Sequence, residues 1–329
     1  MKKILNHLFE YKALSKEQSK EVLMGIAKGD YNTSQIASFL TIYAMRSVTV
    51  AELEGFRDAM LELCLAVDLA DYDPMDVCGT GGDGKDTFNI STLSCFVVAG
   101  AGQRVAKHGN HGVSSTCGSS TVLEYLGIKF SNEQDFLERA IAETGVCFLH
   151  APLFHPAMKN VAPVRRELGV KTFFNMLGPM TNPAFPQKQL AGVFSLELAR
   201  LYAYLYQQTD KKFLVVHALD GYDEVSLTGS FKIITPQAEQ VLSPAQLGLD
   251  TFRAEALAGG ETVAESAEIF MNVLNDKATP AQKQAVLANA ALALHAADPG
   301  LSLTDAVAKA KESIESKKAL ESFQKLVDL

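Results

Sequence analysis

The sequence predicts an α/β protein with a small all-helical N-terminal domain and a larger α/β domain, whose central sheet is mainly parallel and flanked by helices. Residues 1 to about 66 carry apolar side chains at helical spacing throughout. From about residue 70, short β-branched runs alternate with helical stretches, which is typical of a parallel sheet covered by helices. We therefore expect a helical domain over residues 1–68 and an α/β domain over residues 69–329.

The helical domain is predicted from apolar faces and from helix-capping residues. Residues Ser15 to Gln18 form a capping box ahead of one helix. Ser34 and Thr49 are predicted to cap the next two helices. An apolar stripe left on this domain could serve as a subunit interface or could pack on the rest of the chain.

The α/β domain is predicted to alternate strands with helices. We expect strands over Met75–Val77, Arg104–Ala106, Phe213–His217 and Phe231–Thr235, and helices over Ser91–Gly102, Gly118–Leu126, Glu133–Thr144 and Glu197–Thr209. The proline-rich stretch from residue 152 to residue 186 favours a stiff crossover, which we expect to return to the helical domain near residues 165–186 and to form a hinge over a cleft. Helices from Thr262 onward are expected to serve packing only, with Asn289 a satisfied helix residue.

A glycine-rich loop follows the first strand. The segment from Asp76 to Asp83 reads Asp-Val-Cys-Gly-Thr-Gly-Gly-Asp, and Asn89-Ile-Ser-Thr92 leads into an apolar helix. Glycine lets backbone N–H groups approach a ligand, and a helix N-terminus adds unpaired donors and a favourable dipole. The loop lacks the Lys of a Walker A motif and the later acidic residue of a dinucleotide site, so it predicts a phosphate or pyrophosphate site of another kind.

A second loop of similar character follows the second strand. Residues Lys107 to Ser119 supply an ammonium group, two imidazoles, an amide and four hydroxyls. Because the carboxyl ends of parallel strands meet at one edge of a sheet, both loops should face one crevice. Cys78 and Cys117 lie beside these loops, where we expect them to fill space.

Charged residues elsewhere could complete such a site. Asp223 and Glu224 follow the strand Phe213–His217 through a turn. Alone they would indicate a solvated turn, but magnesium takes one or two carboxylates together with substrate phosphate oxygens. Arg165 lies in the crossover and can bind a carboxylate through a two-pronged contact, whereas Arg166 is as well explained by a surface salt bridge.

Composition narrows the function classes. The chain has 329 residues, 47% hydrophobic, with a formal charge of −8, which argues against a general nucleic-acid-binding protein. Five cysteines without a C-x-x-C pair favour reduced thiols and a cytoplasmic location. No run approaches the length of a membrane span, so we expect no membrane partner.

Several stretches together resemble the anthranilate phosphoribosyltransferase family of tryptophan biosynthesis. They are Gly79–Asp83, Asn89–Thr92, Lys107–Asn110, His155–Met158, Val164–Gly169, Phe174–Pro179 and Asp223–Glu224, in the family's order. The resemblance implies a pentosyltransferase that moves the phosphoribosyl group of phosphoribosyl pyrophosphate to anthranilate, with Mg²⁺ as cofactor and a homodimer formed through the helical domain.

The resemblance also implies roles for individual residues. Phosphoribosyl pyrophosphate would be held by Gly79, Gly82, Asp83, Thr87, Asn89, Ser91, Thr92, Lys107 and Ser119. Anthranilate would be contacted by Gly79, Asn110 and Arg165, with His108 and His155 at its entrance, and magnesium by Ser91, Asp223 and Glu224. No protein nucleophile is expected. Lys171 stands where the family usually has arginine and cannot offer a two-pronged contact.

Two other functions fit parts of the sequence. A pyrimidine nucleoside phosphorylase shares the Gly-Thr-Gly-Gly-Asp loop, but that family has a longer C-terminal part and lacks Lys-His-Gly-Asn. A non-enzymatic relative that binds nucleic acid would need a basic groove and a degraded acidic pair, whereas this chain is acidic and keeps Asp223 and Glu224.

Overall fold

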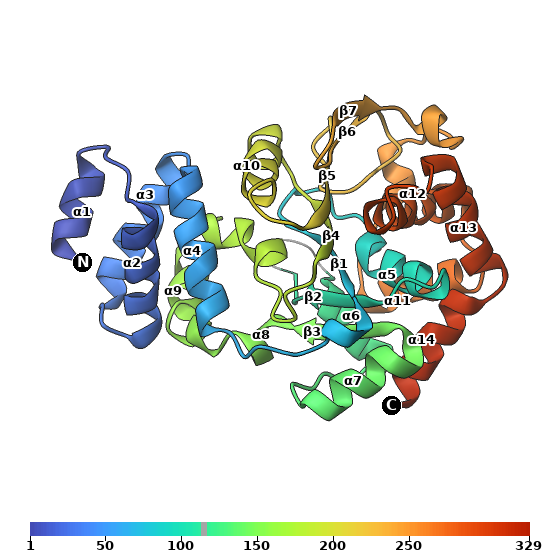
Figure 1. The fold of residues 1–329 in the computed structure, drawn as a ribbon, viewed down its shortest axis with the longest axis horizontal. Helices are drawn as coiled ribbons and strands as arrows, with labels where there is room; N and C mark the ends of the chain where they lie inside the picture. The colour runs from blue at the N-terminus through green and yellow to red at the C-terminus, as the bar shows by residue number, and fades with distance from the viewer. Residues whose placement is uncertain (113–116) are drawn as a thin grey trace.

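The N-terminal part of the chain is a helical bundle in the computed structural model, which describes residues 1–112 and 117–329 (Figure 1). It consists of α1 (Lys2–Phe9), α2 (Lys16–Lys28), α3 (Thr33–Met45) and α4 (Val50–Leu63). Capping boxes begin α2, α3 and α4, at Ser15, Asn32 and Thr49. The prediction that Ser34 caps the third helix is wrong, because the cap is Asn32, two residues earlier, whose side chain accepts from Gln35 N.

The larger domain is built on one sheet, which has seven strands within the described residues, in the order β3-β2-β1-β4-β5-β6-β7. The first five in that order are parallel to their neighbours, and β6 and β7 pair antiparallel at the far edge. The predicted fold class is therefore confirmed. The strands are β1 (Met75–Gly79), β2 (Val105–Gly109), β3 (Val146–His150), β4 (Lys188–Gly192), β5 (Lys212–Ala218), β6 (Phe231–Ile234) and β7 (Glu239–Leu242).

Each face of the sheet packs against a different set of helices. On β5, Leu214 and Val216 join one hydrophobic core, whereas the alternate residues Phe213 and Val215 join another. The first core contains α5 (Ile90–Gly100), α11 (Val263–Leu274), α12 (Pro280–Ala297), α13 (Leu303–Glu315) and α14 (Lys318–Asp328). The second contains α10 (Leu196–Tyr206) and the N-terminal bundle. At the other edge of the sheet, α6 (Ser119–Tyr125) follows β2, and α7 (Gln134–Thr144) packs on β3.

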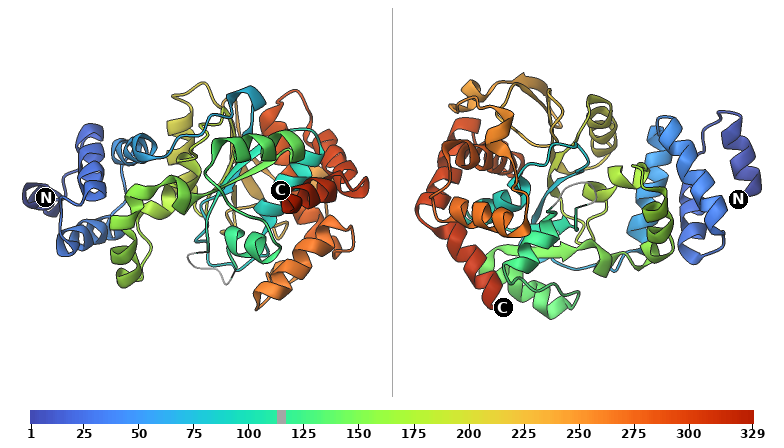
Figure 2. Two further views of the ribbon diagram at one scale, coloured as in Figure 1. Left: turned by 90° about the horizontal axis from the view of Figure 1, so that it is seen from below. Right: turned by 180° about the vertical axis from the view of Figure 1, so that it is seen from behind.

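The proline-rich crossover contains no strand and consists of short helices. They are α8 (Ala151–Phe154), η2 (Pro156–Asn160), α9 (Ala162–Leu168), η3 (Phe173–Met176) and η4 (Gly178–Met180). The segment returns to the bundle, since the Phe173 ring stacks on Phe56 with centroids 4.1 Å apart and meets Phe39 edge-on. Figure 2 shows this segment between the bundle and the sheet. The domain boundary at residue 68 stays a prediction.

The topology gathers the chemically distinctive segments at one edge of the sheet. The two glycine loops follow β1 and β2, which are neighbours, and the acidic pair follows β5, which is separated from β1 only by β4. These are the carboxyl ends of parallel strands, where open α/β sheets bind ligands. In the ranges that the structure describes, no helix is long and apolar enough to cross a membrane.

Candidate active site

The loop after β1 has a backbone that favours glycine. Gly81, Gly82 and Gly84 have φ of 64°, 76° and 73°, in the left-handed region that side chains rarely adopt. The following helix, α5, has no side-chain cap, because the amide of Asn89 donates instead to Cys117 O at 3.0 Å. In the first turn of α5, the Ile90 and Leu93 N–H groups donate to Phe88 O and Asn89 O, and the Ser91 N–H faces Glu224. The Thr92 N–H is therefore the group left available to an anion among the described residues.

A buried ammonium group lies beside this loop. The Lys107 side chain is 3% exposed and donates to Val77 O at 2.6 Å and to Ser91 Oγ at 3.5 Å. Burial acts to lower the pKa of Lys107, but the neighbouring Cys95, Cys78, Asp76 and Glu224 outweigh it and raise the pKa. The site therefore contains a fixed positive charge. Ser114, Ser115 and Thr116, which were expected to add hydroxyls to the second loop, lie outside the described residues.

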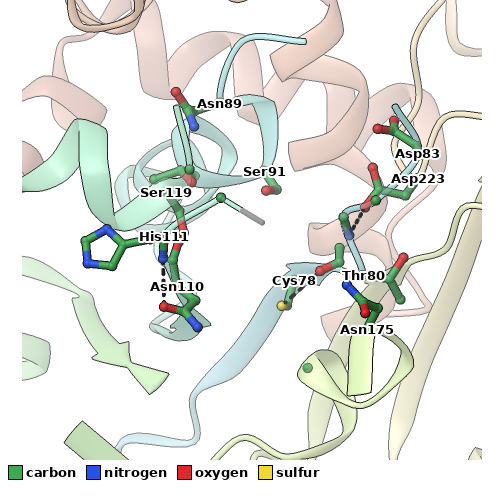
Figure 3. Close-up of a pocket in the computed structure, with 18 of the residues that line it drawn as sticks. Cys78, Thr80, Asp83, Asn89, Ser91, Asn110, His111, Ser119, Asn175 and Asp223 are labelled. Atoms are coloured by element: carbon green, nitrogen blue, oxygen red, sulfur yellow. Dashed lines mark hydrogen bonds between the residues drawn. The ribbon is translucent and has the colours of Figure 1, made fainter. Parts of the chain in front are cut away.

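The segment that carries the acidic pair after β5 packs tightly against the ends of β1 and β4. A Cβ on Gly79 would lie 2.4 Å from Asp223 Oδ2, and a Cβ on Gly192 would lie 1.7 Å from the Asp223 carbonyl oxygen. Asp223 Oδ2 also accepts from Gly81 N at 2.6 Å, which ties the acidic segment to the glycine loop (Figure 3). The two glycines therefore permit a close approach that no other residue would allow.

The surroundings of these two carboxyl groups disfavour their charged forms. Burial, followed by the nearby Asp83, raises the pKa of Asp223. The pKa of Glu224 is also raised, by burial first and then by Asp223 and Asp83, although Lys107 and the Ser91 N–H act in the opposite direction. Glu224 Oε2 is buried without a hydrogen-bond partner among the described residues. A bound cation would lower the pKa of both carboxyl groups and would give Glu224 Oε2 a partner.

The acidic pair suits magnesium when substrate phosphate oxygens and water supply the remaining ligands. Within residues 1–112 and 117–329, no group of three or more His, Cys, Asp or Glu side chains is arranged to hold a metal ion. Magnesium needs only one or two carboxylates when phosphate oxygens and water supply the other ligands. Asp223 and Glu224, with Ser91 lining the same cavity, match that requirement.

Two neutral histidines lie close together, His155 within the crossover segment and His108 at the end of β2. Burial, followed by the charge of His155, lowers the pKa of His108 to about 3, and burial lowers that of His155 to about 4. His108 Nδ1 lies 3.0 Å from Gly178 O, and since a carbonyl only accepts, the ring proton is on Nδ1. Nε2 is left with a free lone pair and no partner among the described residues.

Arg165 reaches the same pocket from α9. Its guanidinium lies 5.1 Å from the centroid of the Phe174 ring. It has no salt bridge or side-chain hydrogen bond within the described part of the chain, and burial lowers its pKa. A half-buried guanidinium without a partner among the described residues is suited to a carboxylate ligand.

One cavity of about 300 Å³ joins these groups. Its lining includes every residue that the sequence assigned to substrate or metal except His155: Gly79, Gly82, Asp83, Thr87, Asn89, Ser91, Thr92, Lys107, His108, Asn110, Ser119, Arg165, Asp223 and Glu224. His155 does not line the cavity. It lies behind His108, with ring centroids 5.2 Å apart, and is hydrogen-bonded to Thr181 O.

Several lining residues were not assigned from the sequence. Thr80, Phe174, Asn175 and Gly178 belong to stretches that resembled the family but were given no role. Thr80 Oγ1 is buried and has no partner among the described residues. Lys171 does not line the cavity, but its ammonium group donates to the Gly82 carbonyl and so links the crossover segment to the glycine loop.

Comparison with known proteins assigns the family. Residues 71–320 match the family model described as glycosyl transferase family, a/b domain, and residues 2–64 match its helical bundle domain. The anthranilate phosphoribosyltransferase of Cytophaga hutchinsonii is 59% identical over 327 residues, which cover 99% of this chain and 100% of that protein. The chain belongs to the anthranilate phosphoribosyltransferase family.

Relatives of this family also share the architecture. The anthranilate phosphoribosyltransferase of Bacteroides thetaiotaomicron is 49% identical and covers 100% of this chain, with 99% of its own length matched. The crystal structure of the Thermus thermophilus enzyme superposes with a TM-score of 0.91 at 35% identity, covering 98% of each chain. The Saccharomyces cerevisiae enzyme in complex with PRPP and Mg superposes with a TM-score of 0.89 at 29% identity, covering 96% of this chain and 93% of that one.

Proposed function

We propose that this protein is an anthranilate phosphoribosyltransferase, which transfers the phosphoribosyl group of phosphoribosyl pyrophosphate to the amine of anthranilate and releases pyrophosphate, a step of tryptophan biosynthesis. One observation carries the proposal. A single cavity contains an anion cradle with a buried Lys107, the acidic pair Asp223 and Glu224, and the unpaired guanidinium of Arg165. A phosphorylated donor with its metal and a carboxylate-bearing acceptor require these three elements together.

We assign the donor to the glycine loop and its surroundings. The N–H groups around Gly79 and Gly82 and the start of α5 would bind phosphate oxygens, and Lys107 would neutralise part of their charge. The remaining assigned residues are Asp83, Thr87, Asn89, Ser91, Thr92 and Ser119, all of which line the same cavity.

We assign magnesium to Asp223 and Glu224 with the hydroxyl of Ser91. Asp223 is buried and Glu224 is half-buried, and burial together with the neighbouring carboxylates raises the pKa of each. When bound, the ion stabilises the negative charge that develops on the departing pyrophosphate. The chain's own part is to hold Asp223 against the ends of β1 and β4, where Gly79 leaves room for its carboxylate and Gly192 for its backbone carbonyl.

We assign anthranilate to the part of the cavity nearest the crossover. Arg165 would bind the carboxylate, Asn110 and Gly79 would contact the ring and amine, and His108 would line the entrance. His155 would then act by supporting the ring of His108 from behind.

The reaction under this proposal depends on positioning and electrostatics. The arylamine is neutral at pH 7, so its nitrogen can attack the anomeric carbon as the bond to pyrophosphate breaks, with a transition state that resembles an oxocarbenium ion. Residues of the chain align the amine and anomeric carbon and hold fixed donors at the departing oxygens. The surplus amine proton can pass to water, because a His108 ring with a pKa of about 3 does not accept it at neutral pH. No side chain needs to act as a nucleophile.

We also propose a homodimer, a cytoplasmic location and a helical domain that comprises residues 1–68 with the segment near 165–186. Support for the dimer comes from exposed apolar side chains on the bundle, with Phe9, Tyr11 and Met45 at 58%, 88% and 81% exposure. All five cysteines are free, as is usual in a reducing compartment. Light scattering tests the dimer, and a monomer would contradict it.

The decay of anthranilate fluorescence tests the function. Purified protein with phosphoribosyl pyrophosphate and magnesium should consume anthranilate, and a chelator should stop the reaction. The double variant Asp223→Asn, Glu224→Gln should lose the dependence on magnesium together with most of the rate. If the folded protein leaves anthranilate unchanged and instead splits thymidine or uridine with phosphate, the phosphorylase function would replace this proposal.

A further inference from the structure

Asn289 lies in the middle of α12, a helix whose other central residues are buried alanine, leucine and valine. We infer that Asn289 is a positioning residue, which holds the backbone at Val225 so that Asp223 and Glu224 present their carboxylates to the cavity. The inference rests on the proposed role of that acidic pair in binding magnesium.

The amide of Asn289 is fully engaged. Oδ1 accepts from Val225 N at 3.0 Å, and Nδ2 donates to Val225 O at 2.9 Å and to Ala285 O at 2.9 Å. The orientation of the amide is fixed, because a flipped amide would place its NH₂ group against the Val225 N–H. Asn289 therefore pairs with Val225 in both directions, as a neighbouring strand would.

Val225 depends on this pairing. The residue is 0% exposed, so water cannot replace a lost partner. In the described ranges, Asn289 is the partner of both the Val225 N–H and the Val225 carbonyl. Buried backbone groups are almost always paired, and removal of this amide would leave two of them without partners.

The paired residue directly follows the acidic pair. Glu224 is joined to Val225 by one peptide bond, and Asp223 is fixed on the other side by its bond to Gly81 N and by the close approach of Gly79. A small cavity lined by Asn289, Asp223, Glu224 and Ser91 lies between α12 and the strand ends. The carboxylates are thus held from the glycine loop on one side and from α12 on the other.

Helix stability does not account for this residue. Asparagine is less favourable than alanine or leucine in a helix interior. Only the bond to Ala285 O lies within α12, and the other two bonds leave the helix for the segment that carries the metal-binding side chains. Groups that orient ligands in this way commonly change metal affinity about 10–100-fold when they are removed.

Binding of Mn²⁺ in the presence of phosphoribosyl pyrophosphate tests the inference without turnover, because anthranilate is left out. Free Mn²⁺ is measured by electron paramagnetic resonance in titrations of the wild type, Asn289→Ala and Asn289→Leu. We expect the dissociation constant for Mn²⁺ to rise about 10–100-fold in both variants. Ser322→Ala is the control, since it removes a buried bond to Thr144 O in the same domain, and its dissociation constant should stay within twofold of the wild type.

The same titrations distinguish an error about Asn289 from an error in the assignment of the metal site. If Asp223→Asn with Glu224→Gln weakens Mn²⁺ binding but a folded Asn289 variant stays within twofold of the wild type, Asn289 does not position the pair. If the acidic double variant binds Mn²⁺ as the wild type does, the metal site itself is misassigned and the inference falls with it.

Hydrogen exchange in the wild type supplies a second test that needs no variant. The Val225 amide should exchange slowly in the free protein, because Asn289 already holds it, and magnesium with phosphoribosyl pyrophosphate should add little protection. Rapid exchange in the free protein, followed by protection only on adding both, would overturn the inference even if every Asn289 variant failed to fold.

Discussion

Gly79 offers a direct test of how closely the acidic pair must approach the strand ends. In Gly79→Ala the new Cβ would lie 2.4 Å from Asp223 Oδ2, whereas ordinary van der Waals contact begins at 3.4 Å. The carboxylate would have to retreat by about 1 Å or the strand end would have to shift. Overpacking of this size costs about 1–3 kcal/mol of stability.

The effect on the reaction should exceed the effect on folding. A displacement of about 1 Å at a catalytic site can reduce the rate about 100-fold. We therefore expect kcat/KM for phosphoribosyl pyrophosphate to fall about 100-fold in Gly79→Ala, and the magnesium concentration for half-maximal rate to rise. Anthranilate fluorescence decay at varied magnesium measures both quantities, and thermal unfolding confirms that the variant is folded.

Gly178→Ala is the matched control for this experiment. Gly178 also lines the cavity, yet a Cβ there would meet no heavy atom within 4 Å, and its φ lies outside the left-handed region. Its kcat/KM should change less than about threefold. If Gly79→Ala retained wild-type kcat/KM and magnesium dependence, the close packing of Asp223 on Gly79 would not be what positions the acidic pair.

Two further predictions concern Arg165 and Asp76. Arg165→Gln should raise KM for anthranilate about 10–100-fold, which is the equivalent of one charged hydrogen-bonding pair. The control is Arg166→Gln at the exposed neighbouring residue, which should leave KM unchanged. Equal KM values for the two variants in steady-state assays would refute the binding of the anthranilate carboxylate by Arg165. Burial raises the pKa of Asp76 to about 6 from an ordinary value of 3.8, so the folded state holds a proton that the unfolded state has lost. Its contribution to stability is therefore present below pH 4 and is lost as pH rises through about 6. Asp76→Asn should flatten this part of the pH dependence, worth up to about 3 kcal/mol by denaturant unfolding, and an unchanged profile would show that Asp76 is ionised in the folded protein throughout.

Local sequence signals predicted the start of a helix correctly where the residues of that helix are enough to determine it. The capping box at Ser15 and the cap at Thr49 begin helices as predicted, because both are satisfied within one turn. The strands β3, β4 and β7 were not predicted. Val146–His150 and Lys188–Gly192 are almost wholly buried and show no alternation, which leaves a short run ambiguous between strand and helix, and Glu239–Leu242 is mostly exposed and has no apolar face.

The sequence by itself determined the chemistry of this protein. The residue types alone indicated the chemical groups of the site. They are two loops with glycine, hydroxyl and ammonium groups, an adjacent carboxylate pair and an arginine in a stiff crossover. Their order along the chain resembled one family. Whether these groups meet was decided by the tertiary structure, because β1, β2 and β5 are brought together by the sheet order rather than by sequence proximity.

Tertiary structure alone also decided which residues support the site. His155 proved to lie behind His108 rather than in the cavity lining, and Asn289, expected only to be satisfied within its helix, bonds to the backbone beside the acidic pair 64 residues earlier in the chain. The physical reason is that a hydrogen bond between distant segments leaves no periodic signal in either one. Such contacts exist only once the hydrophobic cores on both faces of the sheet have fixed the distance between α12 and the strand ends.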